Sequence, residues 1–99
     1  MKAIVCDRYG PPEVLRLEEV ERPAPRDNQV LVKVHATSLN AADFEILGGS
    51  VLARIGGPSR PRNRIPGSDV AGRVVAVGRN TKRLKEGDAV FGDLFTCGF

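Results

Sequence analysis

Cysteine and histidine are scarce in this chain of 99 residues, which contains Cys6, Cys97 and a single histidine, His35. Two cysteines in an otherwise ordinary composition favour free thiols in a reducing compartment over a disulfide. His35 falls on an expected strand, with no cysteine or second histidine close to it in the sequence. A lone histidine of this kind is more often a half-buried structural residue than a metal ligand or a catalytic base.

Two further features are missing. No hydrophobic run approaches the roughly 18 residues of a membrane span, and the short apolar start leads directly into the charged pair Asp7-Arg8 instead of a signal-peptide core. No Gly-x-Gly-x-x-Gly motif, the turn that holds the cofactor in dinucleotide-binding domains, is present. A chain of this length makes one small domain. We therefore expect a single cytoplasmic domain, residues 1–99, without membrane association.

Positive charge is concentrated in one Pro/Gly-rich segment, although the net charge of the chain is only +3. The segment runs from Arg54 to Arg64 and also contains Arg60 and Arg62. Such a cluster could bind an anion or a nucleic acid. No aromatic residue is interleaved for base stacking, so we favour a solvated surface loop and expect no nucleic-acid partner.

Apolar and β-branched patterns predict a protein built mainly from strands. In residues 29–38, the side chains of Val30, Val32 and Val34 alternate with a mixed face that includes His35, as the two-residue period of a strand requires. Turns are expected at residues 26–28 and 85–88. The expected strands are residues 1–7, 13–20, 29–38, 70–77 and 89–91, of which 70–77 reads as buried.

Residues 40–48 are expected to form a short helix. Asn40 is a good N-cap, Asp43 favours the helix N-terminus, and Gly48 suits the left-handed position that ends a helix. Leu39, Phe44 and Leu47 would supply its buried face. The following residues, 49–64, are predicted to be a long irregular loop.

The most specific pattern lies in residues 67–78, which read Gly-x-Asp-x-x-Gly-x-Val-x-x-Val-Gly, followed by Gly-Asp-x-Val-Phe in residues 87–91. Together with residues 1–5, residues 29–40 and the Asn-x-x-Asp motif of residues 40–43, these two patterns follow one another along the chain in a characteristic order. In this order of motifs the sequence resembles the GroES-like catalytic domain of the medium-chain dehydrogenase/reductase superfamily. The resemblance implies a mainly β fold: a GroES-like, partly open β-barrel with one or two short helices. We expect it to be truncated before a Rossmann cofactor domain, as the N-terminal part of a larger two-domain reductase.

The zinc-dependent alcohol dehydrogenases of that superfamily keep a cysteine and a histidine where this sequence has Asn40 and Ser68, and their relay hydroxyl corresponds to Ala42. An amide and a hydroxyl are poor zinc donors beside thiolate and imidazole. Without a Lewis acid, an activated acceptor such as a quinone or enone can still take hydride with hydrogen-bond help. The chain therefore resembles the zinc-independent quinone oxidoreductase branch, which uses NADPH, and no metal ligand is assigned.

In such relatives the asparagine corresponding to Asn40 lies at the floor of the cleft, near the nicotinamide and the substrate, and its amide can donate and accept hydrogen bonds. The same residue could simply cap the helix, and the two roles are compatible. The residues expected to support the cleft structurally are Asp43, Gly67, Ser68 and Asp69. Asp69 could bond a basic side chain or a backbone amide, and no catalytic residue is assigned.

Relatives often carry a tyrosine in the loop after the helix, where it contacts the cofactor. Residues 49–64 have none, and the only tyrosine is Tyr9. This departure leaves substrate preference open.

A free-standing GroES-like co-chaperonin or protein-interaction module is the alternative. Against it, residues 18–25 are rich in glutamate and proline where a co-chaperonin has a mobile apolar loop, and the helix at 40–47 has no counterpart. The last residues of the sequence include the apolar side chains of Leu94, Phe95 and Phe99, which we expect to be exposed. Through an open strand edge, this part of the chain could pair with a second copy and form a homodimer.

Overall fold

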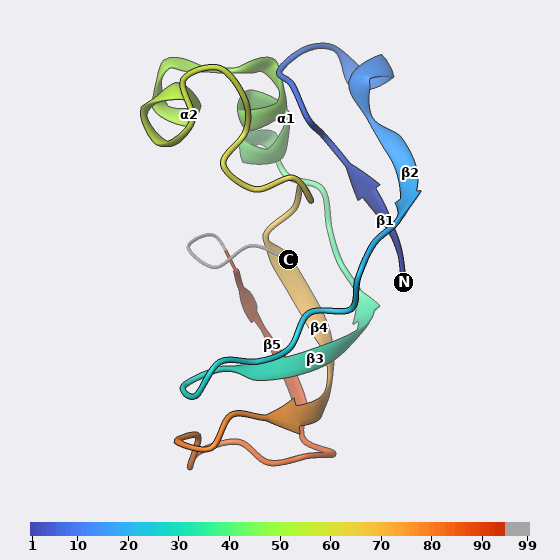
Figure 1. The fold of residues 1–99 in the computed structure, drawn as a ribbon, viewed down its shortest axis with the longest axis vertical. Coiled ribbons are helices and arrows are strands. Elements are labelled where there is room, and N and C mark those ends of the chain that lie inside the picture. Colours follow the sequence, from blue (N-terminus) through green and yellow to red (C-terminus); the bar gives the residue numbers. More distant parts are fainter. Residues whose placement is uncertain (95–99) are drawn as a thin grey trace.

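The computed structural model describes residues 1–94, apart from the side chain of Leu52, and consists mainly of β-strands with two short α-helices (Figure 1). This composition confirms the expected fold class. Cys97, Phe95 and Phe99 lie outside the described residues. In chain order the elements are β1 Lys2–Val5, the 3-10 turn η1 Pro12–Val14, β2 Arg16–Glu19, β3 Val30–Ala36, α1 Ala41–Gly48, α2 Val51–Gly56, β4 Asp69–Val77 and β5 Ala89–Asp93.

The strands form two antiparallel sheets. β1 and β2 pair as a hairpin, with Lys2 opposite Glu19. The other sheet has the order β3-β4-β5. The two helices lie beyond this sheet, at the same end of the molecule as the hairpin (Figure 1). Within residues 1–94 the two sheets share no strand, so the barrel is open, as expected. No helix in this part of the chain combines the length and apolar character needed to cross a membrane.

The buried core is small and centres on one face of β4. Val70 and Val74 are buried, whereas Val75 and Val77 on the opposite face are more than a third exposed. The predicted strand at 70–77 is therefore confirmed, but only one of its faces is covered. Val5 and Cys6, at the end of β1, complete the buried apolar set among the described residues.

β3 confirms the strand predicted at 29–38, but it does not keep a strict alternation. Its register against β4 shifts between Leu31 and Val32 and again between Val34 and Ala36, as a β-bulge would cause. The second irregularity falls beside His35, which is exposed. The prediction of a half-buried histidine was wrong, because this end of β3 has no covering layer in the described structure.

Helix α1 begins after Asn40, as predicted, but ends one residue later than predicted. Gly49, with a φ of 74°, takes the left-handed position that had been assigned to Gly48. The N–H groups of Gly49 and Ser50 donate to the carbonyls of Ile46 and Glu45, both at 3.1 Å, which is the bonding pattern of a Schellman motif. Extending the helix through Gly48 makes both of these bonds possible.

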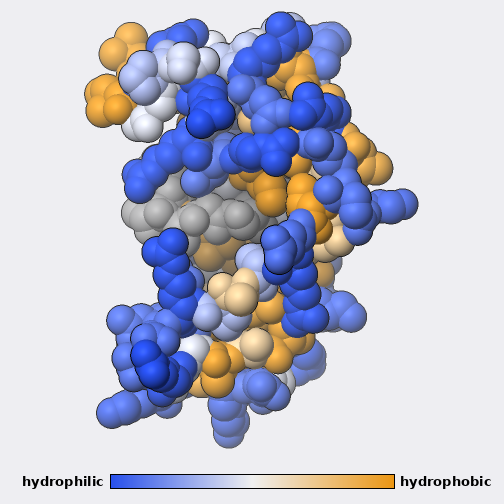
Figure 2. Space-filling view, viewed as in Figure 1, coloured by the Kyte–Doolittle hydropathy of each residue, from blue (hydrophilic) through white to orange (hydrophobic). Residues whose placement is uncertain are grey.

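The expected buried face of α1 is not buried. Leu39 and Phe44 are 75% and 59% exposed, and Leu47 is only half-buried. Helix α2 packs against α1, but it leaves these apolar side chains exposed. Val51 and Ile55 of α2 are also exposed, and the space-filling view shows apolar surface at this corner (Figure 2).

Helix α2 was not predicted, because residues 49–64 were expected to form an irregular loop. Ser50 is its N-cap, and the Ser50 hydroxyl accepts a hydrogen bond from the N–H of Ala53 at 3.3 Å. After α2 the chain folds back compactly, with Gly57 and Pro61 buried. The sequence did not predict this helix because glycine, on both sides of it, and proline, after it, usually mark loops.

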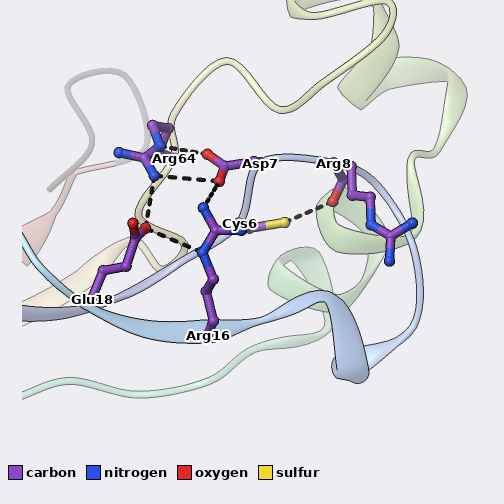
Figure 3. Close-up of polar contacts among 6 residues, drawn as sticks. All are labelled: Cys6, Asp7, Arg8, Arg16, Glu18 and Arg64. Carbon is purple, nitrogen blue, oxygen red and sulfur yellow. Dashed lines mark hydrogen bonds and ion pairs between the residues drawn. The ribbon is translucent and has the colours of Figure 1, made fainter.

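Four charged side chains connect the β1–β2 hairpin to the segment before β4 (Figure 3). Arg64 pairs with Asp7 at 2.5 Å and with Glu18 at 2.8 Å, and Arg16 pairs with the same two carboxylates. The Cys6 N–H donates to the Arg64 carbonyl at 2.7 Å. Arg64 is therefore a structural link, whereas Arg60 and Arg62 are exposed as a solvated loop predicts.

Acid should weaken this connection. The hydrogen bond from Arg64 holds the pKa of Asp7 below its ordinary value of 3.8. A carboxylate whose pKa is lowered by folding stabilises the fold above its unfolded pKa, and this contribution is lost as the pH falls through the folded value. We expect urea unfolding midpoints to fall from neutral pH to about pH 3, and to fall less steeply in Asp7→Asn. Parallel pH profiles for the two proteins would contradict this expectation.

Candidate functional site

The predicted site residues gather where β3 ends, β4 begins and α1 starts. Asp69 is the first residue of β4, and Asn40 immediately precedes α1. The residues between β3 and α1 bring Ser38 and Asn40 against Asp69, 29 to 31 positions later in the chain. Antiparallel pairing of β3 with β4 produces this meeting, because it sets the end of one strand beside the start of the other.

Asp69 is the centre of the hydrogen-bond network. Its Oδ2 accepts from the Asn40 amide nitrogen at 2.5 Å and from the Ser38 hydroxyl at 2.8 Å. Its backbone carbonyl accepts from the Thr37 hydroxyl at 2.6 Å. The bonds from Asn40 and then Ser38 lower the pKa of Asp69, against the opposing effect of burial. Asp69 is therefore an anion at neutral pH that fixes the Asn40 amide nitrogen.

These partners differ from the expected ones. Asp69 bonds a side-chain amide and a hydroxyl instead of a basic side chain or a backbone amide. Thr37 and Ser38 were not singled out in the sequence. The available signal was a pair of consecutive hydroxyl residues, Thr37 and Ser38, shortly before the helix cap at Asn40. Such side chains can bond neighbouring groups without joining a helix.

Asp43 holds the start of α1. Its carboxylate accepts from the Asn40 N–H at 2.8 Å, and its own N–H donates to the Asn40 carbonyl at 3.0 Å. Asp43 is 8% exposed and is the only buried polar or charged residue in the described part of the chain. An acidic group here satisfies amides that the helix leaves without partners.

Gly67 and Ser68 shape the entry into β4. Gly67 has a φ of 111°, a backbone conformation that glycine adopts readily and that residues with a β-carbon strongly disfavour. The Ser68 carbonyl accepts from the Leu94 N–H at 2.7 Å, which continues the β4–β5 pairing beyond the strand. Both residues immediately precede β4, so their backbone conformation sets the position of Asp69.

The donor set at this site consists of amide, hydroxyl and carboxylate groups. Within residues 1–94, no group of three or more histidine, cysteine, aspartate or glutamate side chains gathers closely enough to hold a metal ion. Asn40 is exposed and Ser68 is half-buried, so the Asn40 amide is open to a ligand.

A sequence profile of the alcohol dehydrogenase GroES-like domain matches residues 26–99. The chain belongs to this family. The matched range includes β3, both helices, β4 and β5, and therefore the whole network around Asp69. The resemblance deduced from residues 67–78 and 87–91 is confirmed.

Several known proteins that are similar to this GroES-like domain are oxidoreductases. Human quinone oxidoreductase is 42% identical over 92 residues, which cover 92% of this chain and 26% of the human protein. The NADPH-dependent alkenal/one oxidoreductase of Arabidopsis thaliana is 42% identical over 95 residues, covering 95% of this chain and 24% of that protein. The structure of quinone oxidoreductase from Coxiella burnetii superposes with a TM-score of 0.85 at 38% identity, covering 98% of this chain and 30% of that one.

The chain thus spans about a quarter of the length of these curated relatives. The relatives named here are quinone and enone oxidoreductases, and the GroES-like domain of this chain is similar to a part of each of them.

Proposed function

We propose that this GroES-like domain is the substrate-side part of a zinc-independent, NAD(P)H-dependent oxidoreductase that transfers hydride to a quinone or an enone. The observation that carries the proposal is the exposed Asn40 amide, held in a fixed orientation by Asp69 at 2.5 Å. NADPH would be bound mainly by a separate cofactor domain of the full-length enzyme and would supply the hydride. The 99-residue chain alone should not turn over substrate.

The chemistry of the donors supports a reaction without zinc. A catalytic zinc needs three protein ligands drawn from thiolate, imidazole and carboxylate groups. Asn40 and Ser68 offer an amide and a hydroxyl, and Asn40 is already bonded to Asp69. Removing hydride from an alcohol is favoured by a Lewis acid or a general base that stabilises the alkoxide, whereas a quinone or enone accepts hydride at an activated carbon.

The Asn40 side chain can assist such an acceptor. A side-chain amide carries two N–H groups, and the bond to Asp69 uses one of them. The other N–H group would be free to donate to an oxygen of the substrate or of the nicotinamide carboxamide when these are bound. A donor held in place before the reaction costs no reorganisation when negative charge develops on the acceptor oxygen. Asp69 and Ser38 fix the amide, and Asp43 fixes the start of the helix that carries it.

The test uses the full-length enzyme that carries this domain. We expect NADPH-dependent reduction of a quinone such as 1,4-benzoquinone or of a short enone, unchanged after dialysis against a strong chelator, with no oxidation of simple alcohols. Metal analysis of the same preparation should find no stoichiometric zinc. Chelator-sensitive turnover, restored by added zinc, would contradict the proposal.

A further inference from the structure

Tyr9 lies against helix α2, and 44 positions separate it from Ala53 of that helix. The Tyr9 hydroxyl is 2.5 Å from the carbonyl oxygen of Gly57 and 3.2 Å from that of Ala53, so its single hydrogen donates mainly to Gly57. These carbonyls belong to the last turn of α2 and to the residue that ends it. A six-residue helix is marginal by itself. The Ala53 carbonyl already accepts from the Gly57 N–H, so the Tyr9 hydroxyl adds a donor at the carbonyl of Gly57, the residue that ends the helix.

Arg54 joins Tyr9 to both ends of α2. Its guanidinium carbon lies 4.6 Å from the centre of the Tyr9 ring, within the range of a cation–π contact. Its Nε donates to the Gly49 carbonyl at 2.8 Å, and its Nη1 donates to the Pro58 carbonyl at 3.0 Å. One side chain therefore connects the residues before and after the helix, with the tyrosine ring packed against it.

The same N-terminal segment holds the end of α1. The Gly10 N–H donates to the Leu47 carbonyl at 2.9 Å. A β-carbon on Gly49 would come within about 3 Å of the Tyr9 side chain and of Arg54, so the ring contacts the backbone at the end of α1 directly. At its other end, α1 starts at Asn40, whose amide is bonded to Asp69. Helix α1 is thus fixed at both ends.

We propose that Tyr9 is a positioning residue for Asn40. By holding α2 and the end of α1, it fixes the tilt of the helix that Asn40 immediately precedes. Tyr9 itself donates to backbone carbonyls and does not contact the reacting groups. This inference rests on the proposed function of Asn40, and it adds a residue outside the range matched by the family profile.

A double-mutant cycle in the full-length enzyme tests the inference. Tyr9→Phe keeps the ring but removes the hydroxyl, and we expect it to lower kcat for quinone reduction about five- to tenfold, because misplacing a catalytic group is costly. In the Asn40→Ala background the same change should cost less than about twofold, since coupled residues act non-additively. Thr81→Val is the matched control, because it removes a side-chain hydrogen bond to the Gln29 carbonyl far from α1 and should leave kcat unchanged.

If Tyr9→Phe lowered kcat by the same factor in the wild-type and Asn40→Ala backgrounds, Tyr9 would act only through general stability. That result would overturn this inference but not the proposed role of Asn40. If Asn40→Ala leaves turnover unchanged, the proposed role of Asn40 and this inference both fall. Hydrogen exchange gives an independent measurement: the amides of Arg54 and Gly57 should exchange faster in Tyr9→Phe than in Thr81→Val. Unaltered protection of these amides would also overturn the inference.

Discussion

Replacing Asn40 with alanine is expected to lower kcat for quinone-dependent NADPH oxidation about 10- to 100-fold in the full-length enzyme, because a preorganised donor is lost. The change removes the amide from Asp69 but leaves the Asp43 carboxylate bonded to the backbone N–H of residue 40. Helix α1 should therefore still form, and KM should change less than kcat. Steady-state kinetics together with the circular dichroism spectrum measure the two effects separately.

Ser38→Ala provides a graded comparison. It removes one of the two side-chain donors to Asp69 but keeps the Asn40 bond, so we expect a smaller loss of kcat than in Asn40→Ala. Asn80→Ala is the matched control, because Asn80 lies in the turn after β4, where its backbone N–H bonds Asp27. Full activity in Asn40→Ala, or an equal loss in Asn80→Ala, would remove Asn40 from the mechanism.

Gly72→Ala is expected to destabilise the fold by about 2–4 kcal/mol, because an added methyl group would be forced into neighbouring backbone. Gly72 lies in the middle of β4 and pairs with Val34 of β3. A β-carbon there would overlap the carbonyl group of Lys33, which is itself fixed in the sheet. Relief would require β3 and β4 to move apart, which would disturb the buried Val70 and Val74 as well.

Gly92→Ala is the control for this prediction. Gly92 lies in β5 opposite Val70, and no atom of the described structure comes within 4 Å of a β-carbon built on it. Since strands disfavour glycine, this change should cost nothing or stabilise the fold by less than about 1 kcal/mol. Urea unfolding followed by circular dichroism measures both variants. Equal unfolding midpoints for the two variants would contradict the close contact between Gly72 and the Lys33 carbonyl.

The strands could be predicted because their signals are local. The valine-rich run at 70–77 and the turn at 85–88 carry their information within a few residues, and both are confirmed. The end of α1 could not be predicted to the residue, because Gly48 and Gly49 are both able to end a helix. The choice depends on the bonds that Gly49 and Ser50 make to the last turn.

Helix α2 and the partners of Asp69 depend on distant contacts. Ser50 was a local cap signal, but α2 is completed by Tyr9, which lies 48 positions before Gly57 in the chain. In the same way, Asp69 meets Asn40 only after β3 and β4 have paired. Local reasoning found Asn40 and Asp43 because they bond each other across three positions. It failed for the burial of His35 and Phe44, which depends on what covers them.

The buried thiol of Cys6 has a practical consequence. It is 2% exposed, and its Sγ lies 2.9 Å from the Arg8 carbonyl, directly beside the ion pairs of Asp7. An alkylating reagent reaches this sulfur only when the hairpin separates from the segment at Arg64. The rate at which iodoacetamide modifies Cys6, assigned by peptide mass spectrometry, therefore measures how often the N-terminal hairpin opens.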